Sequence, residues 1–272
     1  MNKVAFTDMK PEVERHQYSQ EIVHLAATFI REKVNEGIIE VALKSSRTDM
    51  VTQVDRATEQ LIKDAILERF PDDSIQGEEY GDITGSSRYQ WVVDPIDGTT
   101  NFVYGFAGYA VSIGIYDREL FRTVSGCVLD VPRDNLYSAL LSQSALKNAK
   151  TITVNQRTTL SEALLATGFS YSDEIRKIQG KIINANITKI RDIRRAGAAS
   201  LDLSMVASGE VDGYYEMGLQ RWDYIAGAFI VEQAGGTVTG GINKLPSYEL
   251  VIAGCNELVA LIEEMVNLDL YR

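Results

Sequence analysis

The segment Asp94–Asn101, Asp-Pro-Ile-Asp-Gly-Thr-Thr-Asn, combines residue types that suit the binding of a metal ion and an anion. Asp94 and Asp97 are three residues apart and follow the apolar run Trp91–Val93, which predicts a buried strand. At the end of a strand both carboxylates would point outward into a cleft, where they can share a hard divalent cation. The donor type favours magnesium, which prefers oxygen ligands in octahedral geometry.

The second half of this segment predicts a site for a phosphate group. Gly98 supplies backbone freedom and lets a ligand approach the main chain closely. Thr99–Asn101 has the pattern of a helix start, whose free N–H groups suit a phosphate oxygen. Ordinary turn chemistry would explain a lone Asp-Gly equally well. It does not explain eight consecutive residues of matching chemistry.

Further carboxylates occur in other parts of the chain. The pair Glu78–Glu79 follows a predicted strand at Ser74–Gln76, and Asp223 begins an apolar helix. Asp55 lies near the start of another predicted helix. Each has an ordinary explanation when considered alone: a solvated acidic turn for the glutamates, and a carboxylate favoured by the helix dipole for the two aspartates.

Composition limits the classes of function. The chain has 272 residues, with 27 Lys and Arg against 38 Asp and Glu, which gives a net charge of −11. Such an acidic chain is a poor candidate for sequence-independent nucleic-acid binding, but bound cations would let it accept a small anionic molecule. No apolar run reaches membrane-spanning length, and residues 1–20 lack the apolar core of a signal peptide. We expect a cytoplasmic protein with Cys127 and Cys255 as reduced core thiols.

Apolar periodicity alternates between helical and strand patterns along the chain. The predicted helices are Gln20–Glu36, Thr52–Phe70, Ser172–Lys189, Ala198–Ser208, Ile225–Gln233 and Asn256–Val266. The predicted strands are Ser74–Gln76, Trp91–Val93, Ala110–Ile115, Thr123–Val131, Asn135–Leu140, Thr151–Val154, Leu164–Phe169, Val211–Tyr215 and Leu250–Ala253.

Helix pairs bracket strand clusters twice, which predicts an α+β fold of stacked layers. The one candidate boundary is Ser142–Lys150, where a predicted hairpin gives way to polar sequence. We expect two subdomains, 1–146 and 147–272, with the site between them.

Several strings together resemble the inositol monophosphatase family, part of the lithium-sensitive phosphatase superfamily. They are Gly77–Glu79, Trp91–Phe102, Trp222–Asp223 and Gly235–Gly236, and they come in the family's order. The string Trp91–Phe102 is highly specific, and supporting matches extend over Lys44–Gly254.

This resemblance implies an α-β-α-β-α sandwich with antiparallel and mixed sheets, a homodimer, and two or three magnesium ions. The implied metal ligands are Glu78, Asp94, the Ile96 carbonyl, Asp97 and Asp223. The implied catalytic residues are Asp55 and Thr99, which would activate the attacking water, together with Glu78. The implied substrate-binding residues are Gly98, Thr99, Gly197, Ala198, Ala199, Glu216 and Asp223.

Three departures from the family pattern concern the substrate. Tyr104 stands where the family often has His, Ala107 near a common Pro, and Ala198 where Ser or Thr is usual. All three would lie near the part of the substrate that carries no phosphate, or near the loop around that part. Inositol monophosphate or a similar polyol phosphate is the expected substrate, and fructose 1,6-bisphosphate and NADP are the alternatives. A non-catalytic binding protein is disfavoured because all the catalytic residues are present.

Three further features have two interpretations each. Lys44 belongs to a loop that could close the site, or it is a surface lysine. The group Arg191, Arg194 and Arg195 could attract an anionic substrate, but a solvated helix end is the preferred interpretation. Tyr214 and Tyr215 fit an alternating strand, and we assign them no catalytic role.

Overall fold

In the computed structural model of the chain, residues 10–37, 41–43, 50–157 and 159–267 and positions 269 and 271 are described. Lys44 lies outside the described residues. The helices are α1 (Pro11–Glu36), α2 (Gln53–Arg69), α3 (Thr99–Val103), α4 (Asp173–Asn186), α5 (Ala199–Ala207), α6 (Arg221–Gln233) and α7 (Asn256–Met265), with a short 3₁₀ helix η1 (Leu160–Glu162).

The described strands form two large sheets and a small pair. The first sheet has the order β3-β4-β5-β6-β7-β8-β9, and it is antiparallel except for the parallel pair β3–β4. Its strands are β3 (Ser74–Gly77), β4 (Tyr89–Asp97), β5 (Ala110–Asp117), β6 (Arg122–Asp130), β7 (Asn135–Leu140), β8 (Leu146–Lys147) and β9 (Lys150–Thr151). The small pair is β1 (Val41–Leu43) and β2 (Met50–Thr52).

The second sheet is mixed. Strand β10 pairs in parallel with β11 and β12, whereas β14 pairs antiparallel with β12 and β13, so the order is β11-β10-β12-β14-β13. Its strands are β10 (Leu164–Thr167), β11 (Asp192–Arg194), β12 (Gly213–Glu216), β13 (Thr237–Thr239) and β14 (Val251–Gly254).

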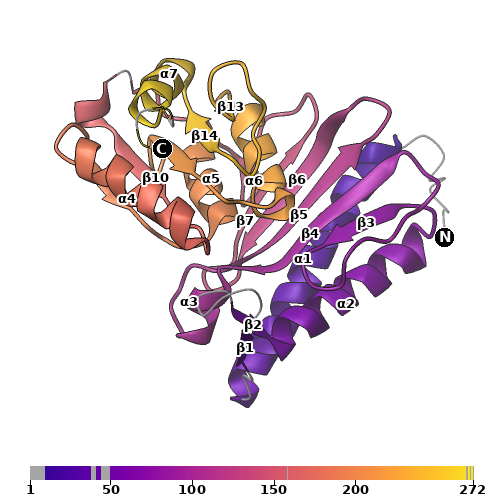
Figure 1. Cartoon of the computed structure of the whole chain (residues 1–272). Coiled ribbons are helices and arrows are strands. Elements are labelled where there is room, and N and C mark those ends of the chain that lie inside the picture. The colour runs from indigo at the N-terminus through magenta and orange to yellow at the C-terminus, as the bar shows by residue number, and fades with distance from the viewer. Residues whose placement is uncertain are drawn as a thin grey trace.

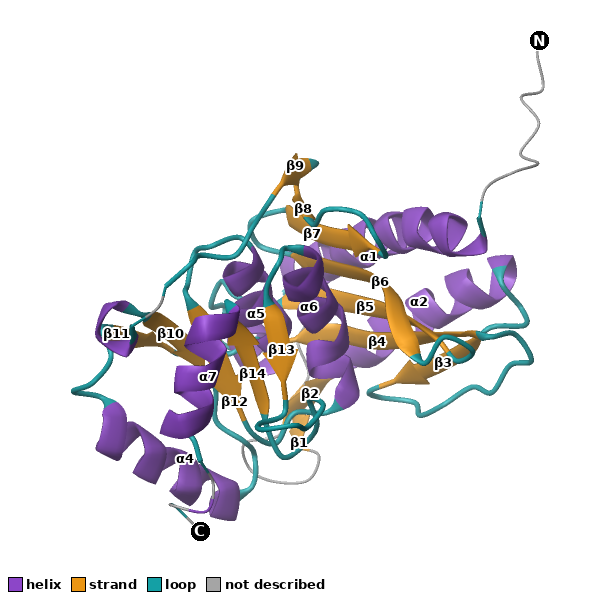
Figure 2. Cartoon of the chain, turned by 90° about the horizontal axis from the view of Figure 1, so that it is seen from above, coloured by secondary structure: helices purple, strands orange, loops and turns teal. Residues whose placement is uncertain are grey.

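The elements stack in five layers, which confirms the expected sandwich (Figure 1, Figure 2). Helices α1 and α2 cover one face of the first sheet, and α5 and α6 lie between the two sheets. Helix α6 contacts strands of both sheets, while α4 and α7 lie on the far side of the second sheet. The middle helical layer therefore fixes one sheet relative to the other.

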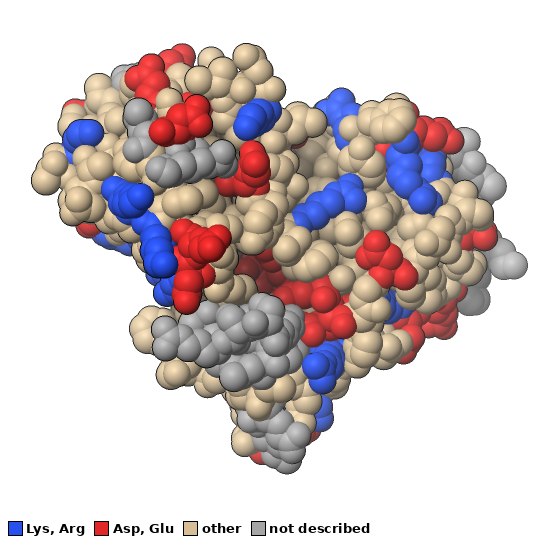
Figure 3. Space-filling view, viewed as in Figure 1, with Lys and Arg blue, Asp and Glu red and all other residues tan. Residues whose placement is uncertain are grey.

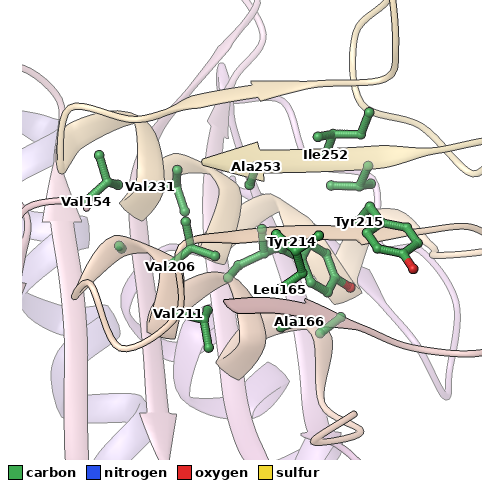
Figure 4. Packing of buried hydrophobic residues seen from close by; sticks show 14 of the residues in the cluster. Val154, Leu165, Ala166, Val206, Val211, Tyr214, Tyr215, Val231, Ile252 and Ala253 are labelled. Carbon is green, nitrogen blue, oxygen red and sulfur yellow. The ribbon is translucent and has the colours of Figure 1, made fainter. Parts of the chain in front are cut away.

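Two apolar cores accompany these layers. One lies between α1, α2 and the first sheet and includes the fully buried Trp91. The other surrounds α5, α6 and the second sheet, where Val206 and Val231 of the helices face Leu165, Tyr214 and Ala253 of the strands (Figure 4). No helix in the described part of the chain has the length and apolar character needed to cross a membrane.

Strand β4 is longer than its apolar run predicts. It continues through Asp94 to Asp97, so the acidic motif is part of the strand and does not follow it. The pairing of β4 with β5 shifts register between Asp94 and Asp97, at the position of Pro95. Proline lacks the N–H that a regular ladder needs, and a bulge re-aims neighbouring side chains.

The start of α1 is also different from the prediction. The helix begins at Pro11 and not at Gln20, although it ends as expected at Glu36 and is followed by Gly37, whose φ is 71°. The buried face of the additional turns is polar: His16 Nδ1 lies 2.8 Å from Ser125 Oγ, and Ser19 Oγ lies 3.0 Å from Cys127 Sγ. A search for apolar periodicity therefore misses these turns.

Helix α6 packs close to the first sheet at two glycines of its strands. A Cβ at Gly126 would lie 2.7 Å from the carbonyl oxygen of Ala226, and one at Gly114 would lie 2.7 Å from Ile225 Cγ2. The Gly126 contact involves helix backbone, which cannot move aside as a side-chain end can. Close packing here keeps the start of α6, and with it Asp223, next to β4.

We therefore expect Gly126→Ala to lower the free energy of unfolding by about 1–3 kcal/mol, because α6 must shift away from the sheet. The matched control is Gly180→Ala on the exposed side of α4, where a Cβ meets no atom within 4 Å. Alanine should stabilise that helix by about 0.5–1 kcal/mol. Urea unfolding of both variants measures the difference, and equal stability of Gly126→Ala and wild type would contradict the packing argument.

Candidate active site

A cleft lies where β4, β10 and β12 end and where α3, α5 and α6 begin. Asp and Glu side chains gather around a hollow on this face of the molecule (Figure 3). The described residues that line the cleft are Glu78, Asp94, Ile96, Asp97, Gly98, Thr99, Gly168, Phe169, Ser170, Tyr171, Arg195, Gly197, Ala199, Glu216, Gly218, Leu219 and Asp223. Segments from 78 to 223 thus meet at one place.

Asp97 connects the motif on β4 to the start of α5. Its Oδ2 accepts hydrogen bonds from the Ser200 N–H at 2.7 Å and the Ser200 hydroxyl at 2.5 Å, and its Oδ1 accepts from the Ala199 N–H at 3.3 Å. These N–H groups belong to the first turn of a helix, where they have no partner within the helix. Burial raises the pKa of Asp97, and the hydrogen bonds from Ser200 and Ala199 oppose that rise.

Asp94 and Asp223 lie in the cleft next to other negatively charged side chains. Burial raises the pKa of each well above its ordinary value, and the negative charges of Glu78 and Asp97 raise both further. Asp94 accepts a 3.1 Å hydrogen bond from the Ile96 N–H, and Asp223 accepts a 2.6 Å hydrogen bond from the Gln220 N–H. Carboxylates this close repel one another unless protons or cations neutralise them.

Thr99 links the cleft to Asp55, which lies behind it. The Thr99 hydroxyl lies 3.0 Å from Asp55 Oδ1 and 3.1 Å from the Ile96 carbonyl oxygen, so its one hydrogen can serve either acceptor. Asp55 is fully buried and does not line the cleft. Its Oδ2 accepts from the N–H of Thr52 at 2.9 Å and from the Thr52 hydroxyl in a capping box. Asp55 therefore reaches the cleft through Thr99.

Gly98 has the conformation and surroundings that only glycine fits. Its φ is 91°, and a Cβ there would lie 2.8 Å from the Gly108 carbonyl oxygen and 3.1 Å from Ala198 Cβ. Ala198 is buried beneath Gly98 and is not among the residues that line the cleft, whereas Gly197 and Ala199 are. Asn101 fixes this corner, since its amide donates 2.7 Å hydrogen bonds to the carbonyl oxygens of Gly108 and Ala196.

Glu216 forms the wall opposite the motif, at the end of β12. Its Oε2 accepts a 2.6 Å hydrogen bond from the Tyr214 hydroxyl. Burial raises the pKa of Glu216 to about 7, although the bond from Tyr214 opposes the rise. Its carboxylate lies so close to β10 that a Cβ at Gly168 would be 2.1 Å from Oε2.

Two residues that sequence analysis missed hold the segment that carries Glu78. Glu59 on α2 accepts hydrogen bonds from the N–H groups of Glu79 at 2.7 Å and Tyr80 at 3.0 Å. Its Oε1 lies 2.8 Å from Nζ of Lys63, one helical turn later, so the two charges form an ion pair. Both side chains are almost fully buried. A Cβ at Gly77 would collide with Glu59, so this glycine admits the buried carboxylate. The only sequence signal was two charges on the apolar face of a helix.

The interpretation of the arginine group as a solvated helix end is wrong. Asp192–Arg194 forms the edge strand β11, and Arg195 lines the cleft. A Cβ at Gly197 would lie 2.3 Å from Nη1 of Arg195, so the side chain folds back over that glycine. Among the described residues that line the cleft, Arg195 is the one Lys or Arg. Its charge opposes the rise in the pKa of Glu216 and of Asp97.

Two of the departures from the family pattern lie away from this cleft. Tyr104 is 76% exposed, and neither it nor Ala107 lines the cleft. Ala107 instead lines a neighbouring hollow together with Phe106, and Arg195 lies at the wall shared by the hollow and the cleft.

The donor set of the cleft fits hard divalent cations. Glu78, Asp94, Asp97 and Asp223 offer oxygen atoms only, and their mutual repulsion is the condition that cations relieve. In the described part of the chain no three His, Cys, Asp or Glu side chains already have the geometry of a metal centre. The oxygens of Asp97 and Asp223 are instead directed to backbone N–H groups.

Comparison with known proteins decides the family. The sequence model of the inositol monophosphatase family matches residues 12–266. The chain belongs to the inositol monophosphatase family. It is 40% identical over 267 residues to inositol-1-monophosphatase SuhB of Mycobacterium tuberculosis, covering 90% of this chain and 91% of that protein. A solved structure of Mycobacterium tuberculosis SuhB matches with a TM-score of 0.81 at 37% identity, covering 96% and 98% of the two chains.

Two other relatives bear on function. The chain is 38% identical over 236 residues to a protein of Escherichia coli K12 named Nus factor SuhB, covering 84% of this chain and 86% of that one. It also matches a structure described as inositol monophosphate bound SaIMPase-II, with a TM-score of 0.76 at 28% identity over 93% and 92% of the two chains.

Because Glu59 holds the backbone that carries Glu78, Glu59→Gln should weaken the apparent affinity for the activating divalent cation about 10- to 100-fold. The measurement is phosphate release as a function of divalent-cation concentration, with thermal unfolding recorded on the same samples. Glu68→Ala, an exposed change on the same helix, is the control. A folded Glu59→Gln variant with an unchanged cation requirement would refute this role.

Proposed function

We propose that this phosphoric monoester hydrolase acts on the phosphate ester of a small polyol or sugar, with inositol monophosphate as the first candidate, in a magnesium-dependent reaction. The observation that carries the proposal is the convergence of Glu78, Asp94, Asp97 and Asp223 in one cleft, with the pKa of Asp94 and of Asp223 raised well above the ordinary range. A dianionic ester could enter so acidic a site only if cations accompany it.

Glu78, Asp94, the Ile96 carbonyl, Asp97 and Asp223 would hold two or three magnesium ions. When bound, magnesium supplies positive charge that neutralises phosphoryl oxygens, acidifies a water and stabilises the leaving oxygen. Hydrolysis of a monoester needs mainly positioning and charge stabilisation, with little covalent chemistry by the protein. The two histidines, His16 and His24, both lie on α1, distant in sequence from the motif, and neither lines the cleft.

Thr99 and Asp55 would orient the attacking water. The Thr99 hydroxyl lines the cleft and would donate its hydrogen to Asp55, so that its oxygen can accept a hydrogen bond from a water and hold the water against the phosphorus. The two bonds from Thr52 keep Asp55 in place as the acceptor of the Thr99 hydrogen. In the overall reaction, water adds to phosphorus, the ester P–O bond breaks, and the alcohol leaves with a proton.

The substrate-binding side would consist of Gly98, Gly197, Ala199 and Glu216. The glycines leave the backbone accessible, and the carboxylate of Glu216 can accept hydrogen bonds from the hydroxyl groups of a polyol. The names of the relatives, an inositol-1-monophosphatase and a structure with inositol monophosphate bound, support a polyol phosphate as the substrate.

A second candidate substrate is a sugar bisphosphate such as fructose 1,6-bisphosphate. The observation that favours it is Arg195, the one Lys or Arg among the described residues that line the cleft. Phosphate release from inositol 1-phosphate, fructose 1,6-bisphosphate and NADP under identical magnesium ranks the candidates. An Arg195→Gln variant that loses activity only on the bisphosphate would favour the second.

We also propose a homodimer, as the family resemblance implies, and a small phosphorylated molecule rather than a nucleic acid as the main partner. The net charge of −11 supports the second statement. Light scattering coupled to gel filtration measures the dimer.

Magnesium removal tests the proposed reaction. EDTA should abolish phosphate release, and added magnesium should restore it. Asp94→Asn should lower turnover by about 10³-fold or more, since a ligand at the centre of the cluster loses its charge. Asp64→Asn, an exposed change on α2, should behave as wild type. Turnover that persists in EDTA, or a near-normal rate in Asp94→Asn, would refute the proposal.

Glu216→Gln should act on the substrate and leave metal binding intact. Loss of hydrogen bonds to a charged acceptor corresponds to a rise in KM for inositol 1-phosphate of about 10- to 100-fold. KM for p-nitrophenyl phosphate, which has no hydroxyl groups for Glu216 to bind, should change less than about threefold by the same reasoning. If the magnesium requirement rose instead, Glu216 would be a metal ligand.

A further inference from the structure

Asp202 is a buried carboxyl group that the proposed reaction does not use. It lies on α5, one turn after the N–H groups that bind Asp97, and its exposed fraction is 0%. Within the described part of the chain neither of its carboxyl oxygens has a hydrogen-bond partner. It does not line the cleft, so it is shielded from the substrate as well as from solvent.

The neighbourhood of Asp202 is negative. The charged groups that act on it are Glu216 on β12, Asp97 on β4, and Arg195 just before α5. Arg195 is the one cation among them, and its side chain is exposed over Gly197. The Tyr214 hydroxyl faces the same region, but its hydrogen is already donated to Glu216. An ionised Asp202 would therefore be a buried charge without a donor, which proteins avoid by retaining the proton.

Glu216, in contrast, accepts a hydrogen bond of the kind that stabilises an ionised carboxylate. The Tyr214 O–H to Oε2 distance of 2.6 Å is in the range typical of a hydroxyl bound to a carboxylate. Glu216 also faces the cleft, where solvent and substrate can satisfy its remaining lone pairs. Of the two neighbouring carboxyl groups, Glu216 is thus the one that can carry a negative charge.

We propose that Asp202 keeps its proton in the folded enzyme and serves as a positioning residue for Glu216, so that the pair holds one negative charge and places it on the carboxylate that faces the substrate hydroxyls. The link to substrate rests on the proposed function, whereas the proton on Asp202 does not. With Asp202 neutral, Glu216 is not driven by repulsion to take up a proton, and it stays a pure acceptor. The pKa shifts agree: burial and then the charge of Glu216 raise the pKa of Asp202 well above its ordinary value.

The pH dependence of stability tests the proton directly. An unfolded Asp loses its proton near pH 4, whereas folded Asp202 retains it to a much higher pH. Between these two values the folded state holds one additional proton, so stability is lost as the pH rises. Relative to Asp202→Asn, which has no such proton, the folding equilibrium constant of wild type should fall tenfold per pH unit from pH 5 to 7.

The measurement is urea unfolding of the full-length chain at saturating magnesium, for wild type and Asp202→Asn in parallel. Asp202→Leu is a second neutral replacement that introduces no polar group into the unpartnered site. Infrared difference spectra at pH 7, wild type minus variant, should show the carbonyl band of a protonated carboxylic acid. Curves of wild type and variant that run parallel from pH 5 to 7, or the absence of that band, would overturn the proposal.

A comparison with Glu216→Gln tests the positioning role. Removal of the Glu216 charge should lower the pKa of Asp202. In the Glu216→Gln background, the tenfold fall of the folding equilibrium constant per pH unit should therefore stop at a lower pH. The selective rise in KM for inositol 1-phosphate caused by Glu216→Gln should be equally large in Asp202→Asn, because Glu216 is the anion in both. If Glu216→Gln raises KM only in the Asp202→Asn background, the charge belongs to Asp202 and the proposal is wrong. The stability curves remain informative even if no polyol phosphate is a substrate.

Discussion

The burial of several carboxylates in one cleft, where the desolvation of their charges is aggravated by mutual repulsion, is the constraint on which the rest of this structure depends. Asp94, Asp97 and Asp223 each have a raised pKa, and in each case burial is the largest cause. A fold stabilised by only about 5–15 kcal/mol tolerates such a cluster only if the surrounding layers hold it in place. Several features of the sandwich serve that purpose: the bulge at Pro95, the first turn of α5 against Asp97, and the glycine-lined path of α6.

The supporting contacts share a common form. Buried acceptors are paired with backbone N–H groups that would otherwise have no partner, as Asp97 is with Ser200 and Glu59 with Glu79 and Tyr80. Such contacts fix the position of a carboxylate without neutralising it, so the cleft remains able to bind cations. Asp202 is the exception, since nothing in the described chain donates to it, and its proton accounts for that difference.

Sequence patterns were sufficient for much of the fold and for the elements that bear the motif. The helices around Thr52–Phe70 and Ile225–Gln233 and the β6–β7 hairpin have regular apolar periodicity, and the structure confirms them. The first turns of α1 were missed because their buried side chains are polar. Arg195 was misjudged because a run of charges around Asp192 reads as solvated surface, although Asp192–Arg194 is an edge strand.

In the candidate site, too, some residues could be predicted from the sequence and others could not. Its acidic residues have recognisable types and spacing, so sequence analysis could name them. Ser200 and Glu59 could not be identified, because their significance comes from contacts between segments up to 103 residues apart. Asp202 could not be identified because only the folded chain shows that it is buried without a hydrogen-bond partner among the described residues. Ser, Glu and Asp on helices are otherwise ordinary surface residues, and only their burial in the folded chain distinguishes them.

The most direct test of this account is an anomalous diffraction map from a crystal grown with manganese and phosphate. The account predicts two or three manganese peaks in the cleft, within ligand distance of Glu78, Asp94, Asp97 and Asp223, with phosphate beside them. A map in which these carboxylates bind no manganese, although the crystallised protein hydrolyses phosphate esters with that ion, would contradict it.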